Sequence, residues 1–248
     1  IPSRALPARF KAPPVVLEKS KELQIAASVE LARVSVAWPT PAFYAAGDAD
    51  LDLAAHILAA GKGSRLYKKL VHDLEWAQDV SVSQSSGELG STFWVTVTVR
   101  DPSKAKDALS VVDTEMAKLA SEGPTDDELK RARTTTLAAF TFGLEKMGSR
   151  ANHINGYMHY TQNPNYLADD LGRYDAVSKD SVKRVMTIGP EVLFSSMQQL
   201  KALGMTAGEV GAAIGAQNIP LPGGRIDTSR DYLTLRVNGR VGLLDDLK

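Results

Sequence analysis

The sequence of 248 residues contains no cysteine. Disulfide bonds, thiol nucleophiles and cysteine-ligated metals are therefore excluded, although this absence selects no cellular compartment. An excess of charge is missing as well, because 29 Lys and Arg residues balance 29 Asp and Glu residues. Electrostatics therefore gives no reason to expect nucleic acid or an anionic membrane as a partner. No apolar run approaches the roughly 18 residues of a membrane span, and no export signal is recognisable.

A histidine-based metal motif is also lacking. The four histidines are His56, His72, His153 and His159, and no two of them are four residues apart. The segment from His72 to Trp76 approaches the zinc-peptidase pattern His-x-x-Glu-His, but Trp76 stands where the second histidine would be. A lone histidine on a helix is more often a surface or core residue than a ligand. We therefore expect no metal ligand in this chain.

Residues 61–80 form the most distinctive local pattern. Glycines at 61 and 63 predict a tight turn, Ser64 is placed to cap a helix, and leucines recur every four residues before a strand that reaches Val80. The glycine turn lacks the final glycine of a serine-nucleophile elbow and the full spacing of a phosphate loop. Its lysines and Arg65 are compatible with an anion-binding patch, but a solvated helix face is the commoner origin of such a run.

Alternation and capping signals predict the remaining elements. One or two strands are expected within residues 24–38, and residues 80–83 and 93–100 should form an antiparallel pair around a turn at 85–90. Helices are expected at 48–60 with Asp48 as cap, from Ser103 to about 122, from a capping box at residues 125–128 to about 147, and at 149–160, 165–173 and 178–186. The fold class is therefore α+β, with a mainly antiparallel sheet covered by helices.

The composition suggests three parts. Residues 1–23 are a proline-rich linker, residues 24–187 are the α+β domain, and residues 188–248 are a separate or foreign αβ tail. In the tail we expect a short helix capped by Thr206 and a hairpin of residues 232–237 and 240–244 around Asn238-Gly239. Because the chain opens on Ile1, we expect it to be a processed or excised piece.

The order of several motifs resembles the second, non-zinc half domain of the pitrilysin/insulinase family of zinc metallopeptidases. The resemblance covers about residues 25–187. Its most specific parts are the Gly-x-Gly-Ser-Arg-Leu-Tyr turn at 61–67 and the helix start Thr-Asp-Asp-Glu-Leu-Lys-Arg-Ala at 125–132; the others are residues 34–39, 48–60, 93–99 and 101–102. It implies two homologous halves around a chamber, of which the other half carries the zinc site and general base. It also implies peptide substrates, no cofactor in this chain, and a bacterial periplasmic or cell-envelope location.

The sequence departs from this family at two positions. The family commonly places an arginine and, seven residues later, a tyrosine after the glycine turn, where they hold substrate. The aligned positions here are Val71 and Gln78, which cannot donate in the same way. Arg65 and Tyr67 are the remaining candidates for substrate contact, with support of the turn as the alternative role.

The tail resembles another class of protein. Motifs within residues 195–248 are similar to a porter segment of resistance-nodulation-division efflux transporters, without any transport residue. This juxtaposition suggests a chimeric chain or a natural fusion.

Three functions are implied by these resemblances. The first is a non-catalytic half domain that completes a peptide-binding chamber with a zinc-bearing partner. The alternatives are a catalytically dead assembly subunit and a fragment of an envelope efflux transporter. Whether the chain takes part in catalysis is left open, because the zinc motif is missing.

Overall fold

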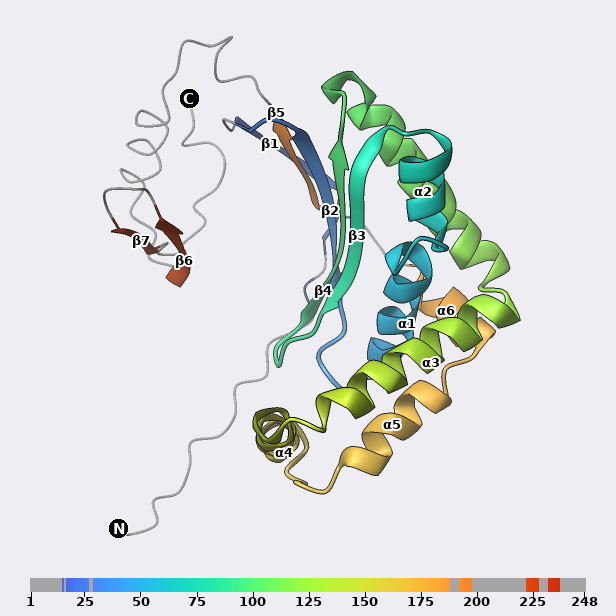
Figure 1. Ribbon diagram of the computed structural model, residues 1–248, viewed down its shortest axis with the longest axis vertical. Coiled ribbons are helices and arrows are strands. Elements are labelled where there is room, and N and C mark those ends of the chain that lie inside the picture. Colours follow the sequence, from blue (N-terminus) through green and yellow to red (C-terminus); the bar gives the residue numbers. More distant parts are fainter. Residues whose placement is uncertain are drawn as a thin grey trace. The chain divides into compact units, whose positions relative to one another are not determined.

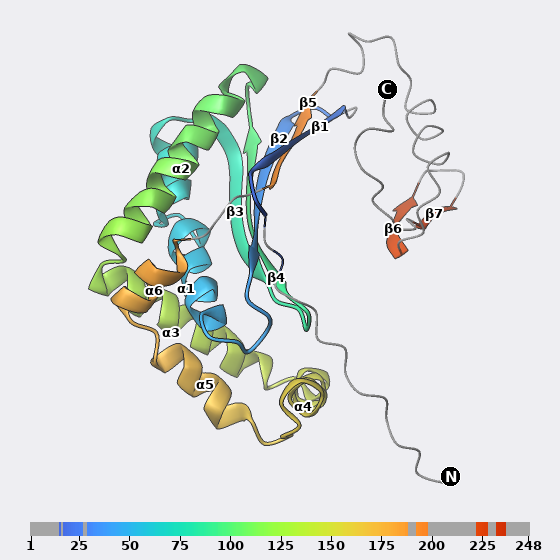
Figure 2. The ribbon, with the colours of Figure 1, turned by 180° about the vertical axis from the view of Figure 1, so that it is seen from behind.

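The computed structural model describes residues 15, 17–26, 29–187, 192–197, 222–227 and 232–236. Its contacts divide the chain into two units, one containing residues 29–197 and the other residues 198–248, and each is described by itself. The first unit is a five-stranded sheet with helices over one face (Figures 1 and 2). The structure therefore has the predicted α+β class.

The sheet has the strand order β1-β5-β2-β4-β3. Its strands are β1 (Lys21–Ala26), β2 (Ala32–Thr40), β3 (Ala77–Ser85), β4 (Ser91–Val99) and β5 (Val192–Met197). β2 pairs antiparallel with β4 and β5, and β3 pairs antiparallel with β4, which confirms the predicted pair of residues 80–83 and 93–100. Alternate residues of β4 are buried, as expected for a strand with one face on the core. β5 extends this sheet past residue 187, and β1 begins inside the segment predicted as a linker.

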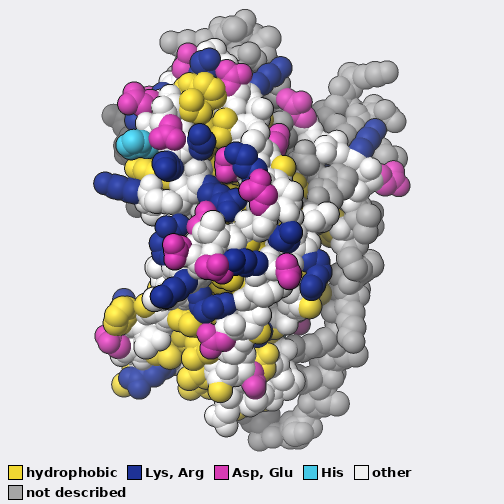
Figure 3. All heavy atoms as spheres, turned by 90° about the vertical axis from the view of Figure 1, so that its right-hand side faces the viewer, with side chains coloured by type: hydrophobic (Ala, Val, Ile, Leu, Met, Phe, Trp, Pro, Cys, Tyr) yellow, Lys and Arg dark blue, Asp and Glu magenta, His cyan; other side chains and the backbone are white. Residues whose placement is uncertain are grey.

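The helices follow the predicted order. They are α1 (Asp48–Ala59), the π-helix η1 (Tyr67–Asp73), the 3-10 turn η2 (Pro102–Lys104), α2 (Ala105–Glu122), α3 (Asp126–Gly143), α4 (Met147–Thr161), α5 (Leu167–Asp175) and α6 (Lys179–Val185). None of the helices in the described ranges is both long and apolar enough to span a bilayer. In Figure 3 charges of both signs are interspersed over the helical side, and hydrophobic side chains gather toward its lower end.

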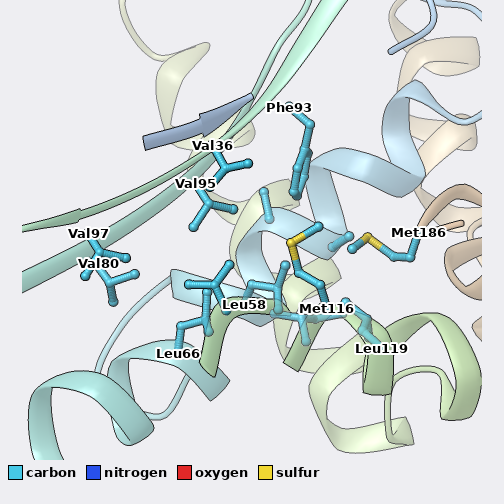
Figure 4. Close-up of a cluster of buried hydrophobic side chains, with 14 of the residues drawn as sticks. Val36, Leu58, Leu66, Val80, Phe93, Val95, Val97, Met116, Leu119 and Met186 are labelled. Atoms are coloured by element: carbon cyan, nitrogen blue, oxygen red, sulfur yellow. The ribbon is translucent and has the colours of Figure 1, made fainter. Parts of the chain in front are cut away.

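The core lies between the sheet and the helices (Figure 4). Strand side chains such as Val95 and Phe93 meet Leu58 of α1 and Met116 of α2 there. These side chains are at most 7% exposed, so each contributes about 2 kcal/mol of apolar burial. After the buried Asp48, alanine, leucine and isoleucine positions give α1 an apolar inner face.

The capping predictions have mixed outcomes. Thr125 and Glu128 form the predicted capping box, with both reciprocal hydrogen bonds present. The prediction for Asp48 is wrong, because Gly47 with φ 93° is the N-cap and Asp48 lies inside the first turn. Ser103 is not a cap either, because the Asp101 carboxylate accepts from its backbone N–H. The local patterns located these helix starts correctly but could not decide where each polar side chain finds its partner.

The helix after the glycine turn also differs from its prediction. Ser64 is fully buried, and its hydroxyl donates back to the Gly61 carbonyl over 2.7 Å instead of accepting from the next turn. The following residues form a π-helix, in which the Leu74 N–H reaches the carbonyl of Lys69 five residues earlier. This wider turn breaks the four-residue repeat. Leu66 and Leu70 are buried, whereas Leu74 is 37% exposed.

In the second unit, β6 (Pro222–Asp227) pairs antiparallel with β7 (Tyr232–Arg236). The predicted strand at residue 232 is therefore present, and its partner in the structure is β6. The predicted pairing around residues 238–239 and the Thr206-capped helix lie outside the described residues.

Candidate functional site

A groove of about 300 Å³ lies between α1 and β3. Four residues of α1, the C-cap residue Ala60 and five residues of β3 line it: Asp52, Ala55, His56, Ala59, Ala60, Val80, Ser81, Val82, Ser83 and Gln84. Two features accompany this open space. Three of the five lining residues on the helix side are alanines, whose side chains fill little volume, and β3 is the last strand in the sheet order. An edge strand offers unpaired backbone donors and acceptors to an additional strand.

A bulge in β3 shapes one end of this edge. Ala77 pairs with Val99 and Asp79 with Thr98, so Gln78 has no partner on β4. A bulge of this kind bends an edge strand and increases its twist. Gln78 is exposed and stands outside the regular ladder of paired residues.

Two titratable side chains of α1, Asp52 and His56, face the groove one helical turn apart. Burial raises the pKa of Asp52 to about 6, and nearby Asp48 adds to this, although a 2.7 Å hydrogen bond from the Tyr174 hydroxyl opposes it. Burial and the charge of Arg131 lower the pKa of His56 below its ordinary value. His56 is therefore neutral near pH 7, and within the described part of the chain its buried Nδ1 has no hydrogen-bond partner. The groove thus combines apolar walls with an acidic and a neutral polar group.

A buried ionic network supports the N-terminal end of α1. The Asp48 carboxylate is completely buried and accepts from the Ser86 hydroxyl at 2.6 Å and from Arg173 Nη1 at 3.1 Å. Arg173 also binds Asp170 at 2.6 Å, and its guanidinium lies 4.5 Å above the ring of Tyr44. These contacts hold α1, α5 and the β3–β4 turn together.

The predicted substrate residues lie elsewhere. Arg65 forms a bidentate ion pair with Glu128, with Nε and Nη2 each 2.7 Å from a carboxylate oxygen, and Nη2 also donates to the Gly123 carbonyl. Tyr67 is half-buried against the core, as is Val71. Neither Arg65 nor Tyr67 lines the groove. Substrate contact by these two residues stays a prediction, and the observed contacts of Arg65 are structural.

The histidines are dispersed. His72 lies 3.0 Å from its neighbour Asp73, His153 packs 4.6 Å from the Phe140 ring, and His159 lies 3.0 Å from Glu88. Among the described residues, no three His, Asp or Glu side chains converge as metal ligands would. The groove residues Asp52 and His56 were not singled out from the sequence. Their spacing on a helix with an alanine stripe was the available signal.

The family model described as the peptidase M16 inactive domain matches residues 1–136, more than half of the chain. The chain belongs to this family. The M16 inactive domain is the half domain that the resemblance to the pitrilysin/insulinase peptidases predicted. The transporter resemblance of residues 195–248 gains no support from the comparisons, and no curated protein gave a significant match.

Solved structures share the M16 inactive-domain fold at low sequence identity. A protease from Helicobacter pylori is 19% identical with a TM-score of 0.69, and the match covers 79% of this chain and 48% of that one. The M16 inactive domain from Pseudomonas fluorescens is 18% identical with a TM-score of 0.67, covering 77% and 46%. The inactive peptidase domain of a zinc protease from Bordetella parapertussis is 19% identical with a TM-score of 0.62, covering 70% and 94%. The matched part is under half the length of the first two.

Proposed function

We propose that this M16 inactive domain is the non-catalytic half of a zinc metallopeptidase, which pairs with a zinc-bearing half of the same fold and forms one wall of a peptide-holding chamber. The observation that carries this proposal is the match to the inactive domain of the family. The length of the structural relatives supports it, because the first two leave room for a second unit of similar size. In this arrangement the partner supplies zinc and the general base, and this chain supplies shape and peptide contacts.

The groove between α1 and β3 is the part of this chain best suited to hold a peptide. An extended segment lying along the outer edge of β3 would satisfy the backbone groups of that strand. Its side chains would alternate, and every second one would point toward the alanines of α1. Asp52 and His56 would then select for a polar or cationic side chain at one position.

The location of the protein belongs to the same proposal. We place it in the bacterial periplasm or cell envelope, as the family resemblance implies. One structure of the same fold is described as the periplasmic protease PqqL from Escherichia coli, with a TM-score of 0.58 and 12% identity. Fractionation of the native host, with detection by antibody, tests this placement.

Reconstitution tests the chamber role. The full chain is mixed with a separately expressed zinc-bearing half domain that carries His-x-x-Glu-His, and cleavage of a fluorogenic unfolded peptide is followed with and without a chelator. We expect chelator-sensitive turnover that requires both chains. Zinc binding and turnover by this chain alone would contradict the proposal.

A second candidate is a catalytically dead assembly subunit. Val71 and Gln78 favour it, because they stand where the family's substrate-holding arginine and tyrosine are expected. A chain of Complex III2 from Candida albicans has the same fold, with a TM-score of 0.64 and 14% identity. Stable association of the two halves without peptide turnover would support this candidate over the chamber role.

A further inference from the structure

α4 carries a narrow apolar seam on its exposed side. The seam consists of Met147, Ala151, Ile154 and Met158. Met147 is 79% exposed, Ile154 51% and Met158 48%. At 3.6 residues per turn, these four positions fall within an arc of about 60° on the helix surface. Phe142, at the end of α3, adds a further exposed apolar side chain just before the seam.

The opposite side of α4 already has its partners. Tyr157 is 2% exposed and donates to Asp170, and Tyr160 packs edge-on against Phe43 at 5.0 Å. The ring of His153 packs against that of Phe140 at a tilt of 51°. Packing of α4 on its own domain therefore does not require the seam. Exposure of four apolar residues to water does not stabilise the fold. Their spacing of four, three and four residues is that of a helix-pairing seam.

The charges around the seam indicate the kind of helix that fits. α4 contains no Asp or Glu, and its one Lys or Arg residue, Arg150, flanks the seam. Lys146 occupies the N-cap position. A second copy of α4 would offer Arg150 no acidic partner, whereas a helix with Glu or Asp beside its apolar stripe would complement both cations.

We infer that the α4 seam docks an amphipathic helix with a narrow apolar stripe and acidic flanks, supplied by the partner half domain. This inference rests on the proposed function for the source of the helix. The seam itself is defined by side chains of this chain, so its helix-binding property can be tested without the partner.

The direct test uses a designed helical peptide of three heptads, with Leu at a and d and Glu at e and g, labelled for fluorescence anisotropy. We expect saturable binding to the full chain. Ile154→Glu and Met158→Glu should each weaken it at least about tenfold, because each places an acid against apolar and acidic groups. Ile154→Leu should retain binding. Leu74→Glu is the matched control, since Leu74 is also an exposed apolar residue, at 37%. It lies just before the start of β3, whereas α4 contacts Glu88 in the turn that follows the end of β3.

Several results would overturn the inference. The inference fails if the peptide does not bind, if Ile154→Glu binds it as tightly as wild type, or if a peptide with Lys at e and g binds wild type equally or more tightly. It also fails if the chain self-associates and Ile154→Glu abolishes that self-association. Reconstitution with the zinc-bearing half separates this inference from the proposed function. If wild type restores turnover and the seam variants associate equally well, the seam assignment fails and the chamber role stands. If the peptide binds at the seam but the two halves do not associate, the helix site stands and the proposed partner is wrong.

Discussion

Arg173 Nη1 donates to Asp48 Oδ2 over 3.1 Å and joins two residues that are 125 positions apart in the chain. Asp48 begins α1 and Arg173 lies near the end of α5, so one buried ion pair fixes two helices against each other. Asp170 shares the guanidinium, and Ser86 brings the β3–β4 turn to the same carboxylate. This network sets the position of α1, and α1 forms one wall of the groove.

Asp48→Ala should be strongly destabilising. The substitution leaves the Arg173 guanidinium, only 16% exposed, with one carboxylate in place of two. Breaking a buried pair in this way typically costs about 3 kcal/mol. We expect a loss of that size in the free energy of unfolding measured with urea. The control is Asp169→Ala, at an exposed position of α5, the helix that carries Arg173. It should change the free energy of unfolding by less than about 0.5 kcal/mol. A similar effect of both substitutions would show that the network contributes little.

Asp52→Asn should change the pH dependence of stability. The pKa of Asp52 rises from 3.8 to about 6 on folding, so between these values the folded state binds more protons than the unfolded state. Wild-type stability relative to Asp52→Asn therefore falls as pH rises from about 4 to 6 and is constant above about 7. Over this pH range the free energy of unfolding of wild type, relative to that of Asp52→Asn, changes by at most about 3 kcal/mol. Melting temperatures across pH 4 to 8 measure it, with Asp169→Asn as control. A difference between the two proteins that is independent of pH would contradict the raised pKa.

Arg65→Lys should destabilise the glycine turn, because an ammonium cannot reproduce the two parallel hydrogen bonds to Glu128. We expect a loss of about 1 to 2 kcal/mol. A double-mutant cycle with Glu128→Gln should give a coupling energy of at least about 1 kcal/mol. The Glu128 pKa is lowered by the Arg65 and Thr125 hydrogen bonds against a cost of burial, so the coupling should be present above pH 4.5 and be lost as pH falls below that. Zero coupling at pH 7 would leave Arg65 free for a ligand and favour its predicted substrate role.

Ala59→Phe should fill the groove and block peptide binding. Ala59 lines the groove and is only partly buried, so a larger side chain occupies space that the fold leaves open. Binding is measured with a fluorescein-labelled extended peptide rich in β-branched residues. We expect its affinity to fall at least about tenfold, equivalent to about 1.4 kcal/mol. The control is Ala139→Phe at an exposed position of α3, which should bind like wild type.

Methylation of the peptide's amides tests strand addition at the same site. Alternate amides of a strand face the same side, so N-methylation of one alternate set should abolish binding and methylation of the other set should preserve it. Equal effects of both sets would show that the peptide does not pair with the edge of β3.

The sequence by itself determined the local elements and the family. The capping box at Thr125, the alternation of β4 and the apolar stripes of α1 and α2 depend on neighbours within a few residues, so their signals are legible in the chain. Tertiary structure decided what these elements do together. It paired Asp48 with Arg173, placed Gln78 in a bulge and left Leu74 partly exposed directly after a π-helix. It also left the α1–β3 groove open, because that space depends on which strand ends the sheet. Such outcomes depend on contacts between residues far apart in sequence, for which the local pattern of a single chain carries no signal.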